Sequence, residues 1–559
     1  MHIDETYPRT INSLPEGATE VWLFESLPAR RAAEARGGPR VRSAYKTLLH
    51  DVMEDGLLDG ATRATIHYPV VDGCPEDRFR LECYPLHELH EWCEIAFAPR
   101  AHEGDGLPEY VVETDLATHR VRVPVRWVED ASGGRILAAC GWASGAGDAH
   151  LPTEYEAIFG RACAAMADLP LDPLNADEPD GPFFDRLEID ATVPAGDLTL
   201  PVGHECISLA EALHEDIYFA SLEIFRHRLG LGPEERSVKS GQVVPRIVTG
   251  DEPRLSMRLV DGTADADAPG ASPALDDATH WLTPGEIAAH LGAIGGTRYE
   301  ARSRQGRAVP GTYVAGRGQA MLAISAGQHA NESSPMVGAL RAGRDLAKTG
   351  RVSFTLNPLE NPDGYAVFRD LCRAQPRHMH HAARYTASGA DLSHGQGRFE
   401  SAIRDIARDH LRAKVHVNLH GYPSHEWTRP LSGYIPHGFG QWTIPKGFFL
   451  ILRHDPDEAE LAARVLGAGL AALAEFPELV AQNRRMLALY DSYVSGRSFD
   501  VYADAIPYTI REEADPGYPV TLITEAPDET IGGEDFRIAQ EGQYRVVMAV
   551  ARALGTGHA

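Results

Sequence analysis

Three short apolar segments of this chain are each followed closely by a histidine or a glutamate. The segments and the residues that follow them are 320–325 with His329 and Glu332, 415–419 with His420, and 520–524 with Glu525. Their length and their apolar or β-branched composition predict three buried strands. Ligands of open α/β sheets gather beyond the carboxyl ends of the strands. We therefore expect two imidazoles and two carboxylates to meet at one sheet edge, as they would in a catalytic site.

The size and charge of the chain limit what it can be. Its 559 residues exceed what one hydrophobic core usually holds, so we expect two or three domains. Lys and Arg number 53 against 80 Asp and Glu, and the resulting net charge of −27 argues against nucleic acid and anionic membranes as partners. The start of the sequence has neither a basic nor an apolar leader, and the seven cysteines form no Cys-x-x-Cys pair. These features favour a cytoplasmic protein, and they leave a homo-oligomer open.

Two linker-like stretches divide the chain into three predicted domains. Residues 167–182 are dense in Pro and Asp, and residues 261–273 are small and acidic. We expect a β-rich domain over 1–170, an α+β domain over 171–275 with a helix from Ser208 to Leu229, and a third domain over 276–559. In the third domain strands alternate with helices, which predicts an α/β fold with a mixed sheet flanked by helices. Its helices are expected at 334–346, 399–412, 457–475 and 534–553.

The spacing of the polar residues is typical of a hydrolytic zinc site. A His-x-x-Glu pair on a loop can place an imidazole and a carboxylate on one ion, and a distant histidine supplies the third ligand. His329, Glu332 and His420 suit these roles, with one zinc ion and a fourth position open to water. A further carboxylate beside that water can act as general base, and Glu525 is the candidate.

Four landmarks give this region a resemblance to the zinc carboxypeptidases, the carboxypeptidase A-like metallopeptidases. In sequence order they are Gly327–Glu332, the Asn-Pro-Asp-Gly turn at Asn361–Gly364, Asn418–Gly421, and the strand segment Val520–Glu525. A further segment, Glu300–Arg307, resembles the part of the family that precedes the first landmark. The resemblance covers roughly residues 278–556, and nothing in residues 1–270 resembles it.

The resemblance implies a mixed-sheet α/β domain in which zinc-bound water, activated by Glu525, hydrolyses a peptide or amide bond. It also implies that Asp391 orients His329 through a hydrogen bond, and that Tyr493 corresponds to the mobile tyrosine of the family. For the arginine that stabilises the oxyanion, an ungapped comparison points to His381, whereas Arg384 lies three residues later. We favour Arg384, because a permanent cation suits a developing negative charge.

The chain departs from the family at the residues that bind the terminal carboxylate of the substrate. The family usually has an Asn-Arg pair where this chain has Ser393 and His394. Arg398 is a candidate replacement, because its guanidinium can bind a carboxylate through two hydrogen bonds. The departure argues against ordinary C-terminal exopeptidase activity and makes a deacylase of N-acyl amino acids, similar to the aspartoacylase-like relatives, the alternative. A non-catalytic zinc-binding protein is the third and least favoured reading.

Two further segments allow more than one interpretation. The segment between Tyr422 and Phe449 either forms a wall or lid of the pocket or packs against a neighbouring domain or subunit; its aromatic and imidazole residues are Trp427, Tyr434, His437, Phe439 and Trp442. A second metal site is conceivable at Cys83, His87, His90 and Cys93. Because their spacing matches no common zinc module, we favour a structural role for these four residues.

Overall fold

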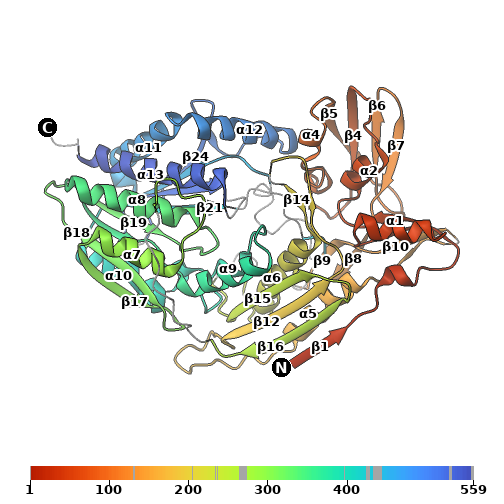
Figure 1. The fold of residues 1–559 in the computed structure, drawn as a ribbon, viewed down its shortest axis with the longest axis horizontal. Helices are drawn as coiled ribbons and strands as arrows, with labels where there is room; N and C mark the ends of the chain where they lie inside the picture. The colour runs from red at the N-terminus through yellow and green to blue at the C-terminus, as the bar shows by residue number, and fades with distance from the viewer. Residues whose placement is uncertain are drawn as a thin grey trace.

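The computed structural model describes residues 2–129, 133–145, 147–203, 205–232, 235, 237–262, 274–395, 397–422, 429–431, 444–515, 517–527 and 532–555. Figure 1 shows the N-terminal half in red to yellow on one side of the molecule and the C-terminal half in green to blue on the other. In the described part of the chain, no helix has the length and apolar character needed to cross a membrane.

One large mixed sheet organises the C-terminal half. Among the described residues it has nine strands in the order β17-β18-β20-β19-β21-β25-β22-β24-β23. Their bounds are β17 Thr297–Arg302, β18 Ala308–Val314, β19 Met321–Ala326, β20 Ser353–Asn357, β21 Val415–Tyr422, β22 Phe449–His454, β23 Asp500–Tyr502, β24 Ile506–Arg511 and β25 Val520–Pro527. The central strands β20, β19, β21 and β25 run parallel, whereas β22 pairs with β25 in the antiparallel sense.

Helices cover both faces of this sheet, as the alternation of strands and helices in the sequence predicts. They are α7 Pro284–Ile294, α8 Ser334–Thr349, α9 Pro362–Ala374, α10 Ala402–His410, α11 Ala459–Ala474, α12 Pro477–Tyr493 and α13 Glu534–Gly555. Helices α8, α11 and α13 bury one face in a core that includes Leu340, Val465 and Val547. On the other face α10 packs through Ile403 against Tyr299 and Val309. The predicted mixed sheet flanked by helices is therefore confirmed, whereas the helices α7, α9 and α12 were not predicted.

The N-terminal half contains several smaller sheets. Its strands are β1 His2–Thr6, β2 Ala18–Leu23, β3 Arg40–Ser43, β4 Arg63–Val70, β5 Glu94–Ala101, β6 Glu109–Thr114, β7 Thr118–Arg122, β8 Val125–Glu129, β9 Arg135–Ala139, β10 Trp142–Gly145, β11 Ala149–His150, β12 Arg186–Val193, β13 Leu198–Thr199, β14 Cys206–Ile207, β15 Gln242–Thr249 and β16 Arg254–Val260. Its helices are α1 Leu27–Ala35, α2 Thr47–Asp55, α3 Arg78–Leu81, α4 Leu86–Leu89, α5 Glu154–Ala167 and α6 Leu209–Arg228.

Strands from both sides of the expected boundary at residue 170 share one sheet. β1, at the start of the chain, pairs with β16, and the sheet has the order β1-β16-β12-β15. One core joins Ile3 to Leu187 and Met257 across that boundary. We therefore treat residues 2–262 as one N-terminal half; the three-domain division stays a prediction, and most of the second linker, residues 263–273, lies outside the described residues.

Helix α6 connects the two halves of the molecule. It begins where the Ser208 hydroxyl accepts a hydrogen bond from the Glu211 amide, as in a helix cap, and it ends at Arg228, close to the predicted bounds. The Glu211 carboxylate accepts a hydrogen bond of 2.7 Å from the Met379 amide of the C-terminal half. At a second place the end of α12 reaches α4 (Figure 1). The N-terminal half thus contacts the C-terminal half at Met379 and at the end of α12.

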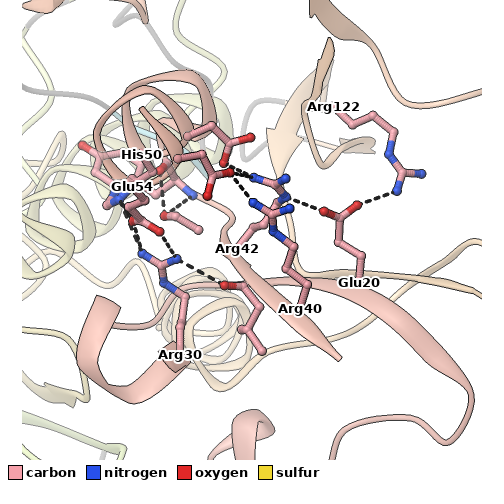
Figure 2. A network of polar contacts seen from close by, with 12 residues as sticks. Glu20, Arg30, Arg40, Arg42, His50, Glu54 and Arg122 are labelled. Atoms are coloured by element: carbon pink, nitrogen blue, oxygen red, sulfur yellow. Dashed lines mark hydrogen bonds and ion pairs between the residues drawn. The ribbon is translucent and has the colours of Figure 1, made fainter. Parts of the chain in front are cut away.

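A buried network of charged groups ties α1, α2 and β3 together (Figure 2). The Arg30 side chain is fully buried and donates two hydrogen bonds to the Glu54 carboxylate, at 2.8 and 2.5 Å. His50 lies 2.8 Å from the same carboxylate. Burial alone would raise the pKa of Glu54, but the hydrogen bonds from His50 and Arg30 lower it to about 2. Nearby, Glu20 accepts from both Arg42 and Arg122.

Glu54→Gln is expected to destabilise the N-terminal half at pH 7 by about 3 kcal/mol, because it leaves the buried Arg30 guanidinium without its counter-charge. A depressed carboxyl pKa contributes stability above the pKa of the unfolded chain and loses it as pH falls. The deficit of the variant should therefore shrink between pH 4.5 and about 2. Unfolding followed by calorimetry at pH 7 and pH 3 measures this, with the exposed Glu16→Gln as control. An equal deficit at both pH values would contradict the assignment.

Candidate metal centre

The alternation of side chains along β21 brings His420 to one face of the sheet. Val415, Val417 and Leu419 point into the core formed with α8 and α13. The alternate residues His416, Asn418 and His420 therefore project from the opposite face. There the Ser325 hydroxyl donates to Asn418 Oδ1 at 2.8 Å. This face carries the polar residues, and His420 lies at its carboxyl edge.

A tight loop after β19 brings His329 and Glu332 to the same edge. Gly327 adopts a positive φ of 68°, and a Cβ atom there would lie 3.1 Å from the Leu359 backbone. The chain then forms a single turn, in which the Glu332 amide donates to the His329 carbonyl at 3.2 Å. The turn places the His329 imidazole and the Glu332 carboxylate, which are three residues apart in the sequence, on the same side of the loop.

Three donor groups converge at this edge. His329 Nδ1 lies 2.8 Å from Glu332 Oε1, His420 Nδ1 lies 2.9 Å from Glu332 Oε2, and the two Nδ1 atoms are 3.1 Å apart. Ligands that make bonds of about 2 Å to a common ion lie roughly 3 Å from one another. Within the described parts of the chain, no other group of three or more His, Cys, Asp or Glu donors lies close enough together to hold a metal ion. The donor set of two imidazoles and a carboxylate fits zinc.

The three buried groups influence the pKa values of one another. Burial alone would raise the pKa of Glu332, but the charges of His329 and His420 hold it below its usual value. Burial lowers the pKa of His420, whereas for His329 burial is outweighed by the carboxylates of Glu332 and Asp391, which raise its pKa. A neutral imidazole and an ionised carboxylate are the forms that bind metal ions.

Asp391, the residue expected to orient His329, contacts the ring of that histidine. Its Oδ2 atom is 3.1 Å from His329 Nε2, the ring nitrogen that faces away from the other two donors. Gln328 donates to Asp391 Oδ1 at 2.9 Å and accepts from Arg404 at 2.7 Å. Arg404 in turn pairs with the buried Glu360 at 2.6 Å. This chain of contacts fixes the orientation of the His329 ring, and Gln328 and Arg404 are parts of it that were not predicted.

Glu525 lies on the neighbouring strand, directly opposite His420 in the parallel register of β21 and β25. Residues paired in this way project from the same face. Burial and then the negative charge of Glu332 raise the pKa of Glu525 well above its usual value, against the opposing charges of Arg384 and Lys446. The predicted base candidate and the three donors therefore share one edge of the sheet.

Arg384 approaches the same edge from the segment after α9. Its Nη1 atom is 3.4 Å from Glu332 Oε1. The Asn-Pro-Asp-Gly turn positions this residue: Asn361 caps α9 through its Oδ1 atom, while its Nδ2 atom donates to the Arg384 carbonyl at 3.2 Å. His381, the ungapped alternative, instead lies 2.6 Å from Glu215 of α6. Of the two residues, the structure brings Arg384 to the donors.

The predicted substrate-binding residues Ser393, His394 and Arg398 lie beyond Asp391. The Ser393 hydroxyl donates to Asp391 Oδ1 at 2.8 Å, and Arg398 pairs with Glu178 of the N-terminal half at 3.1 Å. His394 and Arg398 line a cavity together with Asp391 and Glu178. Their role in binding substrate stays a prediction.

Tyr493 contacts the N-terminal half. It ends α12 and is fully buried, and its hydroxyl accepts a hydrogen bond of 2.9 Å from the His87 amide. Its ring packs against those of Tyr84, His87 and Phe97. The mobile role implied by the family resemblance is not supported by these contacts, because the hydroxyl is fixed by the neighbouring half.

The second metal site considered above comprises Cys83, His87, His90 and Cys93, and two of these residues contact backbone carbonyl groups. Cys83 Sγ lies 3.2 Å from the Phe79 carbonyl, and His87 Nε2 lies 3.1 Å from the Ile95 carbonyl. The four side chains are described but do not form a donor group of the kind found at His420. The aromatic segment after Tyr422 is different: Trp427, Tyr434, His437, Phe439 and Trp442 lie outside the described residues.

Of the comparisons with known proteins, the one with solved structures found matches. No protein-family model and no curated protein matches the sequence. Among solved structures, a metallo-carboxypeptidase from Burkholderia cenocepacia matches 49% of this chain and 70% of its own, at 16% identity and a TM-score of 0.31. Carboxypeptidase A from Helicoverpa armigera matches 56% of this chain and 90% of its own, at 12% identity and a TM-score of 0.31. Likenesses this low carry no functional conclusion, so the site depends on its own geometry.

Proposed function

We propose that this chain is a zinc-dependent hydrolase of a peptide or amide bond. The single observation that carries the proposal is the meeting of four side chains from three strand ends: His329 and Glu332, His420, and the opposed Glu525. Bound zinc would lower the pKa of a water ligand and polarise the carbonyl of the substrate. His329 Nδ1, His420 Nδ1 and the Glu332 carboxylate would hold the ion.

Glu525 would act as the general base. Its carboxylate would accept a proton from the attacking water and then deliver it to the nitrogen of the leaving amine. The raised pKa of Glu525 in the protein alone opposes ionisation. The positive charge of a metal ion acts in the opposite direction, because it compensates the negative charge of Glu332. A bound metal ion would therefore favour the ionised form of Glu525 that a base requires.

Arg384 would stabilise the negative charge that develops on the carbonyl oxygen. Its guanidinium is a permanent cation and lies within 3.4 Å of the donor Glu332. Donors fixed in advance around the reacting atoms supply much of the rate enhancement of hydrolases. Asn361 and Asp391 would act as positioning residues, because each touches Arg384 or a metal ligand rather than the substrate.

A deacylase of N-acyl amino acids is the second candidate, favoured by the contacts around Ser393. The two residues that replace the Asn-Arg pair of the family do not form an equivalent clamp: Ser393 bonds to Asp391, and His394 lines the cavity. Arg398, the suggested replacement, is paired with Glu178. These three residues therefore do not reproduce the carboxylate clamp of the family, and this departure keeps the second candidate open.

The experiment that tests the proposal compares two substrate panels on one metal-analysed preparation. Zinc content is measured by mass spectrometry, and hydrolysis of C-terminal peptides and of N-acyl amino acids is measured before and after treatment with a chelator. We expect about one zinc per chain and hydrolysis in one panel, lost with the metal and restored by added Zn²⁺. A protein that hydrolyses neither panel, or one whose hydrolysis survives metal removal, would contradict the proposal.

A further inference from the structure

A row of side chains crosses the metal-bearing face of the sheet beyond the metal ligands. Strand β25 lies between β21 and β22, so Glu525 is directly opposite His420 on one side and Phe449 on the other. Tyr422, two residues after His420, shares this face, and its ring centroid is 5.1 Å from that of Phe449. The row therefore continues from the metal ligands, past Glu525, to an aromatic surface.

The amine of Lys446 lies over this aromatic surface. Its Nζ atom is 4.7 Å from the ring centroid of Phe449, 5.7 Å from that of Tyr422 and 6.0 Å from that of Phe499. Ring faces attract an ammonium group at such distances. The residue is only 6% exposed, which is rare for a lysine. A buried amine in this position indicates a role beyond solubility.

The backbone around Lys446 is held in place. The Lys446 amide donates to the Tyr422 hydroxyl at 3.1 Å, and that hydroxyl donates to the Gly447 carbonyl at 2.8 Å. Asn483 of α12 accepts from the Phe448 amide and donates to the Phe448 carbonyl, at 2.7 and 2.8 Å. The amine is thus presented by a fixed segment, as a binding group should be.

Lys446 and Arg384 are two cations at opposite ends of the reacting region. Arg384 contacts the metal ligand Glu332, whereas Lys446 lies beyond Glu525 on the side of β22. Burial lowers the pKa of Lys446 to about 8, against the opposing charge of Glu525. The amine is still mainly protonated at neutral pH. A substrate that spans Glu525 would therefore meet a positive charge at each end.

We propose that Lys446 and the three rings beneath it bind a carboxylate group of the substrate on the β22 side of Glu525. A carboxylate on a short apolar stem suits the site, because the ammonium offers charged donors while the rings offer apolar contact. The inference depends on the proposed hydrolase function, since it assigns part of the substrate of that reaction. It also supplies this chain with a carboxylate-binding residue at a position other than Ser393 and His394.

Two pairs of synthetic substrates test the inference and locate the carboxylate. One pair is N-succinyl-phenylalaninamide and its succinamoyl analogue, which differ on the acyl side; the other is N-acetyl-phenylalanine and its carboxamide, which differ on the amine side. In one pair, Lys446→Met should lower the ratio of kcat/KM for the acid over the amide by about 10- to 100-fold, through KM. Lys446→Arg should retain most of that preference, and the exposed Lys348→Met is the matched control.

Each outcome separates this inference from its competitors. A loss of kcat that is equal for acids and amides would overturn it and would make Lys446 a positioning residue for Glu525. A wild-type enzyme without preference for either acid would also overturn it. If the wild type hydrolyses none of the four compounds, calorimetric binding of the same compounds to the wild type and to Lys446→Met still decides. Should Lys446→Met fail to fold, Lys446→Gln is used in its place.

Discussion

Glu525→Gln is expected to reduce kcat by about 10²- to 10⁴-fold while the zinc content stays at the wild-type level. Glutamine keeps the size of the side chain but cannot accept the proton of the attacking water. Glu525 lies opposite His420 on the neighbouring strand and is not one of the three donors, so its replacement should leave the metal ligands in place. Steady-state kinetics on the substrate found for the wild type, together with metal analysis of the same preparation, measure both effects.

The exposed Glu513→Gln, two residues after the end of strand β24, is the matched control for the loss of one carboxylate. It should retain full activity and full metal content. A Glu525→Gln enzyme that still hydrolyses substrate at more than a tenth of the wild-type rate would exclude Glu525 as the base. A variant that also loses its zinc would instead make Glu525 part of the metal site.

The convergence of the three donor residues could be predicted because strand periodicity and residue chemistry agree at these positions. On β21 the residues Val415, Val417 and Leu419 are buried in the core, so the intervening His420 projects from the other face. The same reasoning applies to Glu525 at the end of β25, which the register places opposite His420. The parallel order of the central strands follows from the alternation of strands and helices. The sequence therefore contains both the sheet and the edge at which its polar residues meet.

The residues around the ligands were harder to predict, because their contacts come from distant parts of the chain. His381 and Arg384 are three residues apart and chemically plausible at the same site, but the partner of His381 is Glu215, 166 residues away on α6. Tyr493 is bound by the His87 amide, 406 residues away. Nothing in the local sequence of 377–385 or 490–496 indicates these partners. Such contacts depend on how the N-terminal half packs, which its sequence does not reveal.

Lys446 was missed for a different reason. It lies between Pro445 and Gly447, immediately before the apolar residues that begin β22. A lysine before a strand usually lies at the surface. Only the antiparallel register, which sets Phe449 opposite Glu525, brings this amine to the metal-bearing face. The local sequence predicts the strand but not the direction in which it runs beside its neighbour.

His420→Ala is expected to weaken zinc binding on the order of 10³-fold and to abolish hydrolysis. Three donors would hold the ion. Structural zinc sites bind with apparent free energies of about 10–16 kcal/mol, and if three donors share an energy of this size, the loss of one should weaken binding on the order of 10³-fold. His420 also contacts the Glu332 carboxylate at 2.9 Å, and its removal leaves that buried charge less well compensated. Equilibrium dialysis against a zinc buffer measures the affinity directly, independently of activity.

Asp391→Asn is expected to lower the affinity for zinc by less than His420→Ala does, as a shared metal site requires. Asp391 contacts His329 Nε2 at 3.1 Å rather than the ion, so its replacement should weaken zinc binding by about 10- to 100-fold, less than the loss of His420. The exposed His410→Ala should leave zinc affinity at the wild-type value. The order His420→Ala, Asp391→Asn, His410→Ala follows from distance to the ion alone. If His420→Ala bound zinc as tightly as His410→Ala does, the three donors would not share an ion, and the hydrolase proposal would lose its basis.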